Sequence, residues 1–348
     1  MGIVEVNRGL PIIIIDKMVT NILQVQANYY LPLAVKSHLP QQVSLYLLRN
    51  ILLPLIACIL IPVHAIYADE QQDTTSKPPL FTEILVFAQL SESAYESRDA
   101  VVRFAKEMGS ELTMYEQLPG LEVTFLLLTD KANKTQWIAI RGTVTVMNTL
   151  VNLDVQLRPD NDIGIQLHSG FAETAKTIFQ KITPELKKEY VTKISGHSLG
   201  GAVATILAMY LDINSYSVAR VVTFGQPKIT NITGAQKFSH LDVLRVVTAR
   251  DYVPLLPPVD VVDINNIDIY WPLGQEIILL DNNEYSIAKG LNSMLRATKF
   301  FNKQPDQTNF QAHRIEHYLQ AIKNRQQGAR WIPYKNDFSI FSIFGEER

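Results

Sequence analysis

The sequence predicts an α/β protein whose single core begins near residue 80 of a 348-residue chain. Residues 190–194 have the composition of a β-strand, and residues 203–211 directly after them are typical of a buried helix. Two further apolar runs, at 137–140 and 244–248, are typical of buried strands. The residues from 80 onward are ample for one α/β core. Alternating strands and helices of this kind favour the α/β class.

The junction between the first strand and its helix carries the pattern Gly196-His197-Ser198-Leu199-Gly200. A residue at the apex of such a strand-to-helix turn takes strained backbone angles that expose its hydroxyl. The two glycines leave free the space that a Cβ would fill, and the helix N-terminus directs N–H groups at charge developing beside the serine. The pattern predicts a nucleophilic serine, and the alternative is a chance G-x-S-x-G.

Such a serine needs a histidine base and an orienting carboxylate, expected in the order serine, acid, histidine. Asp251 follows the predicted strand at 244–248, in a loop closed by Pro257 and Pro258. This loop leaves the edge of the sheet at which α/β active sites form. Taken alone, Asp251 also fits an ordinary solvated turn. Its place after Ser198 makes it the expected acid.

Only two histidines, His313 and His317, follow Asp251 and are therefore candidates for the base. They are four residues apart and would share one face if the segment is helical throughout. The alternative is a pair of surface histidines that flank a buried Ile315. The segment also matches H-x-x-E-H, a pattern of zinc peptidases. That reading needs a third ligand, and the acidic residues beyond His317 lie close to the C-terminus without a helical setting.

The tetrahedral intermediate of acyl transfer needs two oxyanion donors, and the N–H of Leu199 supplies one. The second should follow an earlier strand. The strand at 137–140 ends in Arg141-Gly142-Thr143. Thr143 is the candidate, through its N–H and its hydroxyl.

Five segments together resemble one known family, in the order in which that family has them. They are residues 140–143, 167–171, 196–202, 224–227 and 251–258. They closely resemble the class 3 (fungal-type) lipase family, and the resemblance extends from about residue 85 to about 322. It implies an α/β-hydrolase fold, with a central, mostly parallel sheet flanked by helices. It also implies cleavage of carboxylic esters of acylglycerols or phospholipids through an acyl-enzyme, with no metal or cofactor.

The resemblance carries roles onto individual residues. It implies a nucleophile, an acid and two oxyanion donors: Ser198, Asp251, and Thr143 with Leu199. Many members place the base a fixed distance before a tyrosine, which puts it at His313 relative to Tyr318. Because Arg314 and Ile315 replace the usual Ser-Met, His317 stays an alternative base.

Residues 144–154, directly after the expected oxyanion loop, show apolar residues at helical spacing. A helix of this kind is either a lid over an apolar site or an ordinary core helix. The lid interpretation predicts activity that rises at a lipid interface.

The sequence divides into an N-terminal extension at 1–68, a polar linker at 69–80, a catalytic domain at 81–325 and a C-terminal tail at 326–348. The extension contains an apolar segment at about 51–68, with Arg49 before it and acidic residues after it. This pattern predicts either a cleaved export signal or a retained membrane anchor, with the catalytic domain outside the cytoplasm. A buried helix, or a lipoprotein attached at Cys58, are the alternatives.

Composition limits the partners. The formal net charge is −2 and charged residues make up 19% of the chain, which gives no sign of a nucleic-acid partner. The single cysteine excludes an intrachain disulfide. The expected partners are a lipid ester substrate and a lipid interface or membrane. The alternative function is a non-catalytic protein of the same fold that binds a lipid or a partner, and such a protein would usually have lost one of the site residues.

Overall fold

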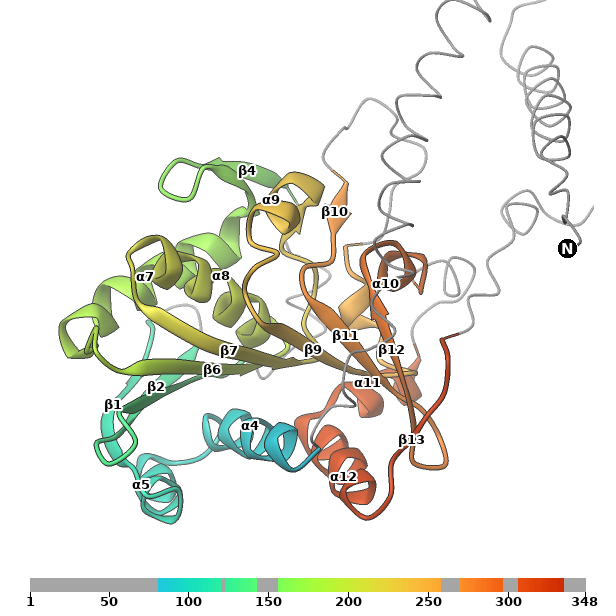
Figure 1. Ribbon diagram of the computed structural model, residues 1–348, viewed down its shortest axis with the longest axis horizontal. Coiled ribbons are helices and arrows are strands. Elements are labelled where there is room, and N and C mark those ends of the chain that lie inside the picture. The colour runs from blue at the N-terminus through green and yellow to red at the C-terminus, as the bar shows by residue number, and fades with distance from the viewer. Residues whose placement is uncertain (1–80, 120–122, 143–155, 258–268, 297–305, 335–348) are drawn as a thin grey trace, which may run out of the picture. The chain divides into compact units, whose positions relative to one another are not determined.

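The computed structural model describes residues 81–119, 123–142, 156–257, 269–296 and 306–334 (Figure 1). By its contacts the chain divides into Met1–Ser76 and Lys77–Arg348, and all described residues belong to the second unit. The predicted extension at 1–68, its apolar segment at 51–68 and the linker at 69–80 lie outside the described residues. Thr143 and the candidate lid at 144–154 also lie outside them. Within the described ranges, no helix is long and apolar enough to cross a membrane.

The core of the described region is a nine-stranded sheet of order β1-β2-β3-β6-β7-β9-β11-β12-β13. The strands from β3 to β11 are parallel, whereas β1, β2 and β12 pair antiparallel with their inner neighbours. The strands are β1 Glu111–Gln117, β2 Thr124–Asp130, β3 Thr135–Ile140, β6 Val191–His197, β7 Ser217–Phe224, β9 Val243–Thr248, β11 Gln275–Leu279, β12 Glu284–Lys289 and β13 Arg330–Trp331. The predicted mostly parallel sheet is confirmed.

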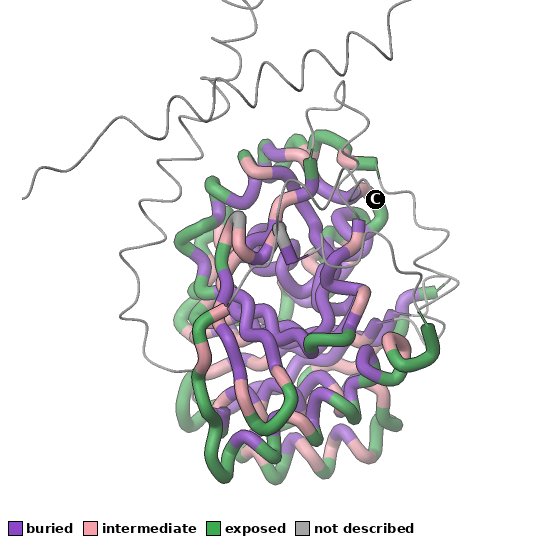
Figure 2. Tube along the Cα trace, turned by 90° about the vertical axis from the view of Figure 1, so that its right-hand side faces the viewer, coloured by how far each residue is buried: buried purple, intermediate pink, exposed green. Residues whose placement is uncertain are grey.

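Helices cover both faces of this sheet (Figure 1). On one face lie α7, Ser169–Ile182, and α8, Leu199–Ile213. On the other lie α4, Phe81–Ser93, and α12, Ile315–Gln326. The central strands are buried on both sides, as parallel strands between helices are expected to be, and Figure 2 shows buried residues filling the interior.

The remaining elements lie around this core. A four-stranded sheet of order β10-β8-β5-β4 is made of Tyr270–Trp271, Thr230–Asn231, Ile165–His168 and Leu157–Asp160. Among the described residues, the other α-helices are α5 Arg98–Glu107, α9 Ile232–Lys237, α10 Gly290–Leu295 and α11 Gln307–His313. Within the segment expected to be the C-terminal tail, β13 pairs with β12 and extends the main sheet.

The first turn of α8 approaches the sheet very closely. A Cβ on Gly200 would lie 2.1 Å from the carbonyl oxygen of Ile140 at the end of β3. A Cβ on Gly196 would lie 2.3 Å from the carbonyl oxygen of Gly200. Only glycine fits at both positions, so the predicted use of these glycines to clear the turn is confirmed.

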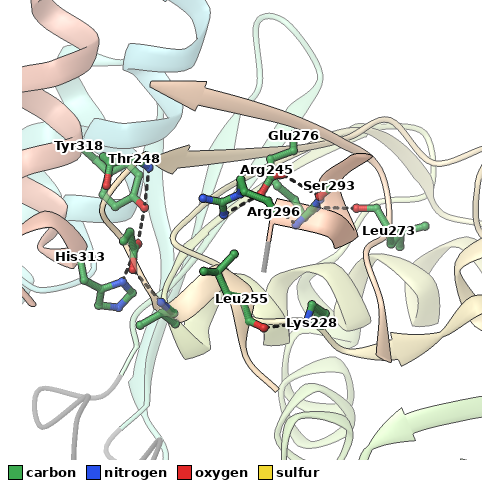
Figure 3. Close-up of polar contacts among 12 residues, drawn as sticks. Lys228, Arg245, Thr248, Leu255, Leu273, Glu276, Ser293, Arg296, His313 and Tyr318 are labelled. Atoms are coloured by element: carbon green, nitrogen blue, oxygen red, sulfur yellow. Dashed lines mark hydrogen bonds and ion pairs between the residues drawn. The ribbon is translucent and has the colours of Figure 1, made fainter. Parts of the chain in front are cut away.

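A buried ionic cluster lies between β9, β11 and α10 (Figure 3). Glu276 accepts hydrogen bonds from Arg296 at 3.0 Å and from Ser293 at 2.7 Å. Arg245, its partner in the register of β9 and β11, lies 3.7 Å away and donates to Ser293 at 2.6 Å. These charged side chains are almost completely buried. The negative charge of Glu276 therefore compensates the positive charges of Arg245 and Arg296, which are shielded from water.

Lys228 lies near this cluster and holds the loop that follows Asp251. Its Nζ donates to the carbonyl oxygens of Leu255 at 2.7 Å and Pro257 at 2.6 Å. Burial, together with the positive charges of Arg245 and Arg296, lowers the pKa of Lys228 to about 7. The folded protein therefore releases this proton far more readily than an unfolded chain does.

This difference predicts how stability depends on pH. Between pH 7 and about 10, unfolded Lys228 binds a proton that the folded form has lost, so the free energy of unfolding should rise with pH. Relative to Lys228→Met, the wild-type value should rise by up to about 1.4 kcal/mol per pH unit in this range and stay level below it. Urea unfolding at several pH values measures the difference, with exposed Lys131→Met as the control. Parallel curves for wild type and Lys228→Met would contradict the burial argument.

Candidate active site

Ser198 occupies the turn between β6 and α8 that the sequence predicts. Its backbone has φ 59° and ψ −131°, in the region that residues other than glycine rarely adopt. The Ser198 N–H donates to the carbonyl oxygen of Phe224 at the end of β7, at 2.8 Å, which ties the turn to the neighbouring strand. The predicted strand, turn and helix are confirmed. A backbone conformation of this kind costs about 1–3 kcal/mol, and the surrounding structure holds Ser198 in it.

The hydroxyl of Ser198 contacts a histidine that is in turn held by a carboxylate. Ser198 Oγ lies 2.9 Å from His313 Nε2, and His313 Nδ1 lies 2.8 Å from Asp251 Oδ2. All three side chains are buried. The structure therefore brings together the three residues that the sequence analysis proposed as nucleophile, base and acid.

Asp251 follows β9 and makes three contacts in a buried position. Its Oδ1 accepts from the Val253 N–H at 2.9 Å, and its Oδ2 accepts from the Tyr318 hydroxyl as well as from His313. Burial alone would raise the pKa of Asp251. The charge and hydrogen bond of His313, with those from Tyr318 and Val253, outweigh burial and hold this pKa below its ordinary value. Asp251 therefore stays ionised and able to hold a positive imidazolium.

His313 and His317 do not share a helix face. Helix α11 ends at His313, Arg314 is extended with φ −65° and ψ 141°, and α12 starts at Ile315. His313 is buried at the site, whereas His317 is exposed. The condition for a shared face, a segment that is helical throughout, is not met, because the last carbonyls of α11 bind side chains of the sheet and not the amides of a further turn.

The residues of the H-x-x-E-H pattern have separate partners. His313 contacts Ser198 and Asp251, and Glu316 pairs with Arg314 at 3.1 Å. In the described part of the chain, no group of three or more potential metal ligands lies close enough to hold an ion. These contacts do not form the zinc site that the pattern would need.

One of the two expected oxyanion donors lies within the described residues. Leu199 is the first residue of α8, and the first amides of a helix have no partner within it. Its N–H therefore lies at the positive end of the helix dipole, beside the nucleophile. Thr143 is outside the described residues, but Gly142 before it is not. A Cβ on Gly142 would lie 2.9 Å from Cβ of Ser198.

Two residues at the site were given no individual role by the sequence analysis. Gly225, with φ 61°, lies against the acid and base, since a Cβ there would be 2.8 Å from both Asp251 Oδ2 and His313 Cε1. The ring of His197 lies 4.8 Å from that of His313. Both belong to segments that carry the family resemblance, and this was the only sequence signal for them.

The arrangement can perform nucleophilic catalysis. His313 Nε2 is within hydrogen-bonding distance of the Ser198 proton, and Asp251 stabilises the imidazolium that forms. The helix N-terminus at Leu199 can stabilise negative charge beside the serine.

Parts of this chain are similar to known lipases. The class 3 lipase family matches residues 137–261. A secreted mono- and diacylglycerol lipase 1 of Fusarium solani is 31% identical over 147 residues, which are 38% of this chain and 42% of that protein. The phospholipase A1 PLIP2 of Arabidopsis thaliana is 27% identical over 143 residues, 36% of this chain and 20% of that protein. The chain thus spans less than half the length of each of these relatives.

A solved structure gives the same fold. Lipase II from Rhizopus niveus superposes with a TM-score of 0.50 at 19% identity, over 57% of this chain and 80% of that one. The chain has the α/β-hydrolase fold, as predicted. Its central part, residues 137–261, is similar to the class 3 lipase family.

Proposed function

We propose that this protein is a serine hydrolase that cleaves carboxylic esters of lipids, acylglycerols or phospholipids, through an acyl-enzyme intermediate. The observation that carries the proposal is the continuous hydrogen-bonded row from Ser198 Oγ through His313 to Asp251. Its lipid substrates are supported by the names of the relatives, a mono- and diacylglycerol lipase and a phospholipase A1.

In the first half of the reaction, His313 Nε2 takes the proton of Ser198 as Oγ attacks the ester carbonyl carbon. The carbonyl oxygen becomes an oxyanion, which the N–H groups of Leu199 and Thr143 hold. When the tetrahedral intermediate collapses, the bond to the alcohol breaks and the alcohol leaves with the proton from His313. The acyl group is then bound to Ser198.

In the second half, water replaces the alcohol. His313 takes a proton from the water as its oxygen attacks the acyl carbon, and Ser198 leaves with that proton as the carboxylic acid forms. Asp251 stays ionised throughout and orients the imidazole. The Tyr318 hydroxyl and the Val253 N–H hold Asp251 in place, as their contacts with its two oxygens support.

We also propose an exported or membrane-anchored location, with the catalytic domain at 81–325 outside the cytoplasm. The word "secreted" in the name of the Fusarium relative supports export. The segment at 51–68 then acts as the export signal or the anchor. A lipid interface is the expected site of action, and residues 144–154 are the candidate lid.

The nucleophile is tested by Ser198→Ala. Hydrolysis of short- and long-chain nitrophenyl esters, of emulsified acylglycerol and of phospholipid vesicles should fall at least about 10³-fold, because the acyl-enzyme does not form. Circular dichroism shows whether the variant is folded. If wild type and folded Ser198→Ala are equally inert on every ester, the hydrolase proposal is wrong, and the non-catalytic alternative takes its place.

The base is tested by a matched pair of alanine variants. His313→Ala should lower kcat by about 10³-fold or more, since no other group contacts Ser198 Oγ as a proton acceptor among the described residues. His317→Ala should keep nearly full activity, because its side chain is exposed. Initial rates on one soluble ester compare the two variants. Loss of activity in His317→Ala alone would overturn the assignment of His313.

A further inference from the structure

The main chain of His313 is anchored at its carbonyl oxygens. His313 is the last residue of α11, and the last carbonyls of a helix have no partner within it. The carbonyl of Ala312 accepts from Thr248 Oγ1 at 3.1 Å, and the carbonyl of His313 lies 2.7 Å from His197 Nε2. Thr248 ends β9, which leads to the acid, and His197 ends β6, which leads to the nucleophile. The residue that carries the base is thus tied to both strands that carry its partners.

The contacts of His197 define which ring nitrogen carries the proton. A carbonyl oxygen only accepts, so Nε2 must donate to His313. The other nitrogen, Nδ1, lies 2.7 Å from the hydroxyl of Tyr95. In a neutral ring this nitrogen accepts, and the Tyr95 O–H is its donor. Tyr95 therefore donates a hydrogen bond to His197, and His197 donates one to the main-chain carbonyl of His313.

His197 stays neutral in this position. Burial, and next the charge of the neighbouring His313, lower the pKa of His197 to about 3. Its ring centroid is 4.8 Å from that of His313, which becomes positive during catalysis. A second positive imidazole at this distance would oppose that charge, and a neutral one does not.

Tyr95 connects this contact to a further part of the site. It lies just after α4, and burial raises the pKa of its hydroxyl above the ordinary value, so that it stays a donor. The Tyr95 oxygen also lies against Gly142, since a Cβ on Gly142 would be 3.3 Å from it. Gly142 in turn lies against Ser198. The Tyr95 hydroxyl therefore lies beside the segment that follows β3 and contacts the histidine that holds the base.

We propose that His197 and Tyr95 are positioning residues, in which Tyr95 fixes the Nε2–H tautomer of His197 so that His197 holds the main chain of His313 at the site. The inference rests on the proposed function, since it assigns a role in the same reaction. A histidine that only filled the core would not need a defined tautomer, whereas this one needs both of its nitrogens in defined roles.

Two substitutions of His197 separate its contacts. The Nε2 of glutamine lies as many bonds from Cα as the Nε2 of histidine, so His197→Gln keeps a donor for the His313 carbonyl. Asparagine reaches only as far as Nδ1, so His197→Asn keeps a group for Tyr95 and loses that donor. Both introduce a buried amide, which makes each the control of the other for stability, measured by thermal unfolding.

On a soluble short-chain ester, His197→Gln should keep kcat within about 5-fold of wild type. His197→Asn should lose about 10- to 100-fold in both kcat and kcat/KM, because displacement of the base affects the chemical steps. Equal kcat values in the two folded variants would overturn the inference while leaving the hydrolase proposal intact. If wild type itself matches Ser198→Ala, the hydrolase proposal fails instead.

The tautomer can be observed without any activity. In protein with ¹⁵N-labelled histidine, His197 should show a protonated Nε2 and an unprotonated Nδ1 from pH 5 to pH 9. Tyr95→Phe keeps the His313 carbonyl but removes the donor to Nδ1, so it should weaken the preference for this tautomer and lower kcat in the same direction as His197→Asn. A wild-type His197 that is protonated at Nδ1, or that gains a second proton within this pH range, would overturn the inference even if His197→Asn does not fold.

Discussion

The backbone of Ser198 lies in a strained region because β6 passes directly into α8 without a loop. The rest of the site depends on this constraint. It directs Oγ away from the helix and towards His313, and it places the N-terminal amides of α8 beside the reacting atom. The close approach at Gly196 and Gly200 makes the turn possible, and the hydrogen bond from the Ser198 N–H to Phe224 fixes it to the next strand.

Buried charged groups are stabilised by their neighbours at two places, the active site and the ionic cluster. Asp251 is completely buried, yet His313, Tyr318 and the Val253 N–H all stabilise its ionised form. In the ionic cluster, Glu276 balances two arginines, while Lys228 holds the loop after Asp251 through two carbonyl oxygens. Its low pKa allows it to do so in the neutral form. The loop that carries the acid is thus held from both ends.

Local patterns predicted those parts of the fold and site whose geometry is set by neighbours in sequence. The turn at Ser198 follows from one strand, one helix and two glycines, and Asp251 follows from a strand that ends before a proline-rich loop. The break between His313 and His317 was not predictable in this way. It depends on Thr248 and His197, which reach the end of α11 from distant strands. The contact of Tyr95 with His197 joins residues 102 positions apart, which no local pattern reports.

If His313 activates Ser198 as a nucleophile, Ser198 should react with reagents that modify only activated serines. Reaction with a fluorophosphonate ester, which phosphorylates activated serines, followed by mass spectrometry of the peptides, tests this directly. One adduct should form, on the peptide that contains Ser198, in the folded protein and not in the urea-unfolded chain. Labelling of other residues in the folded protein with Ser198 unmodified, or equal labelling of folded and unfolded chains, would contradict it.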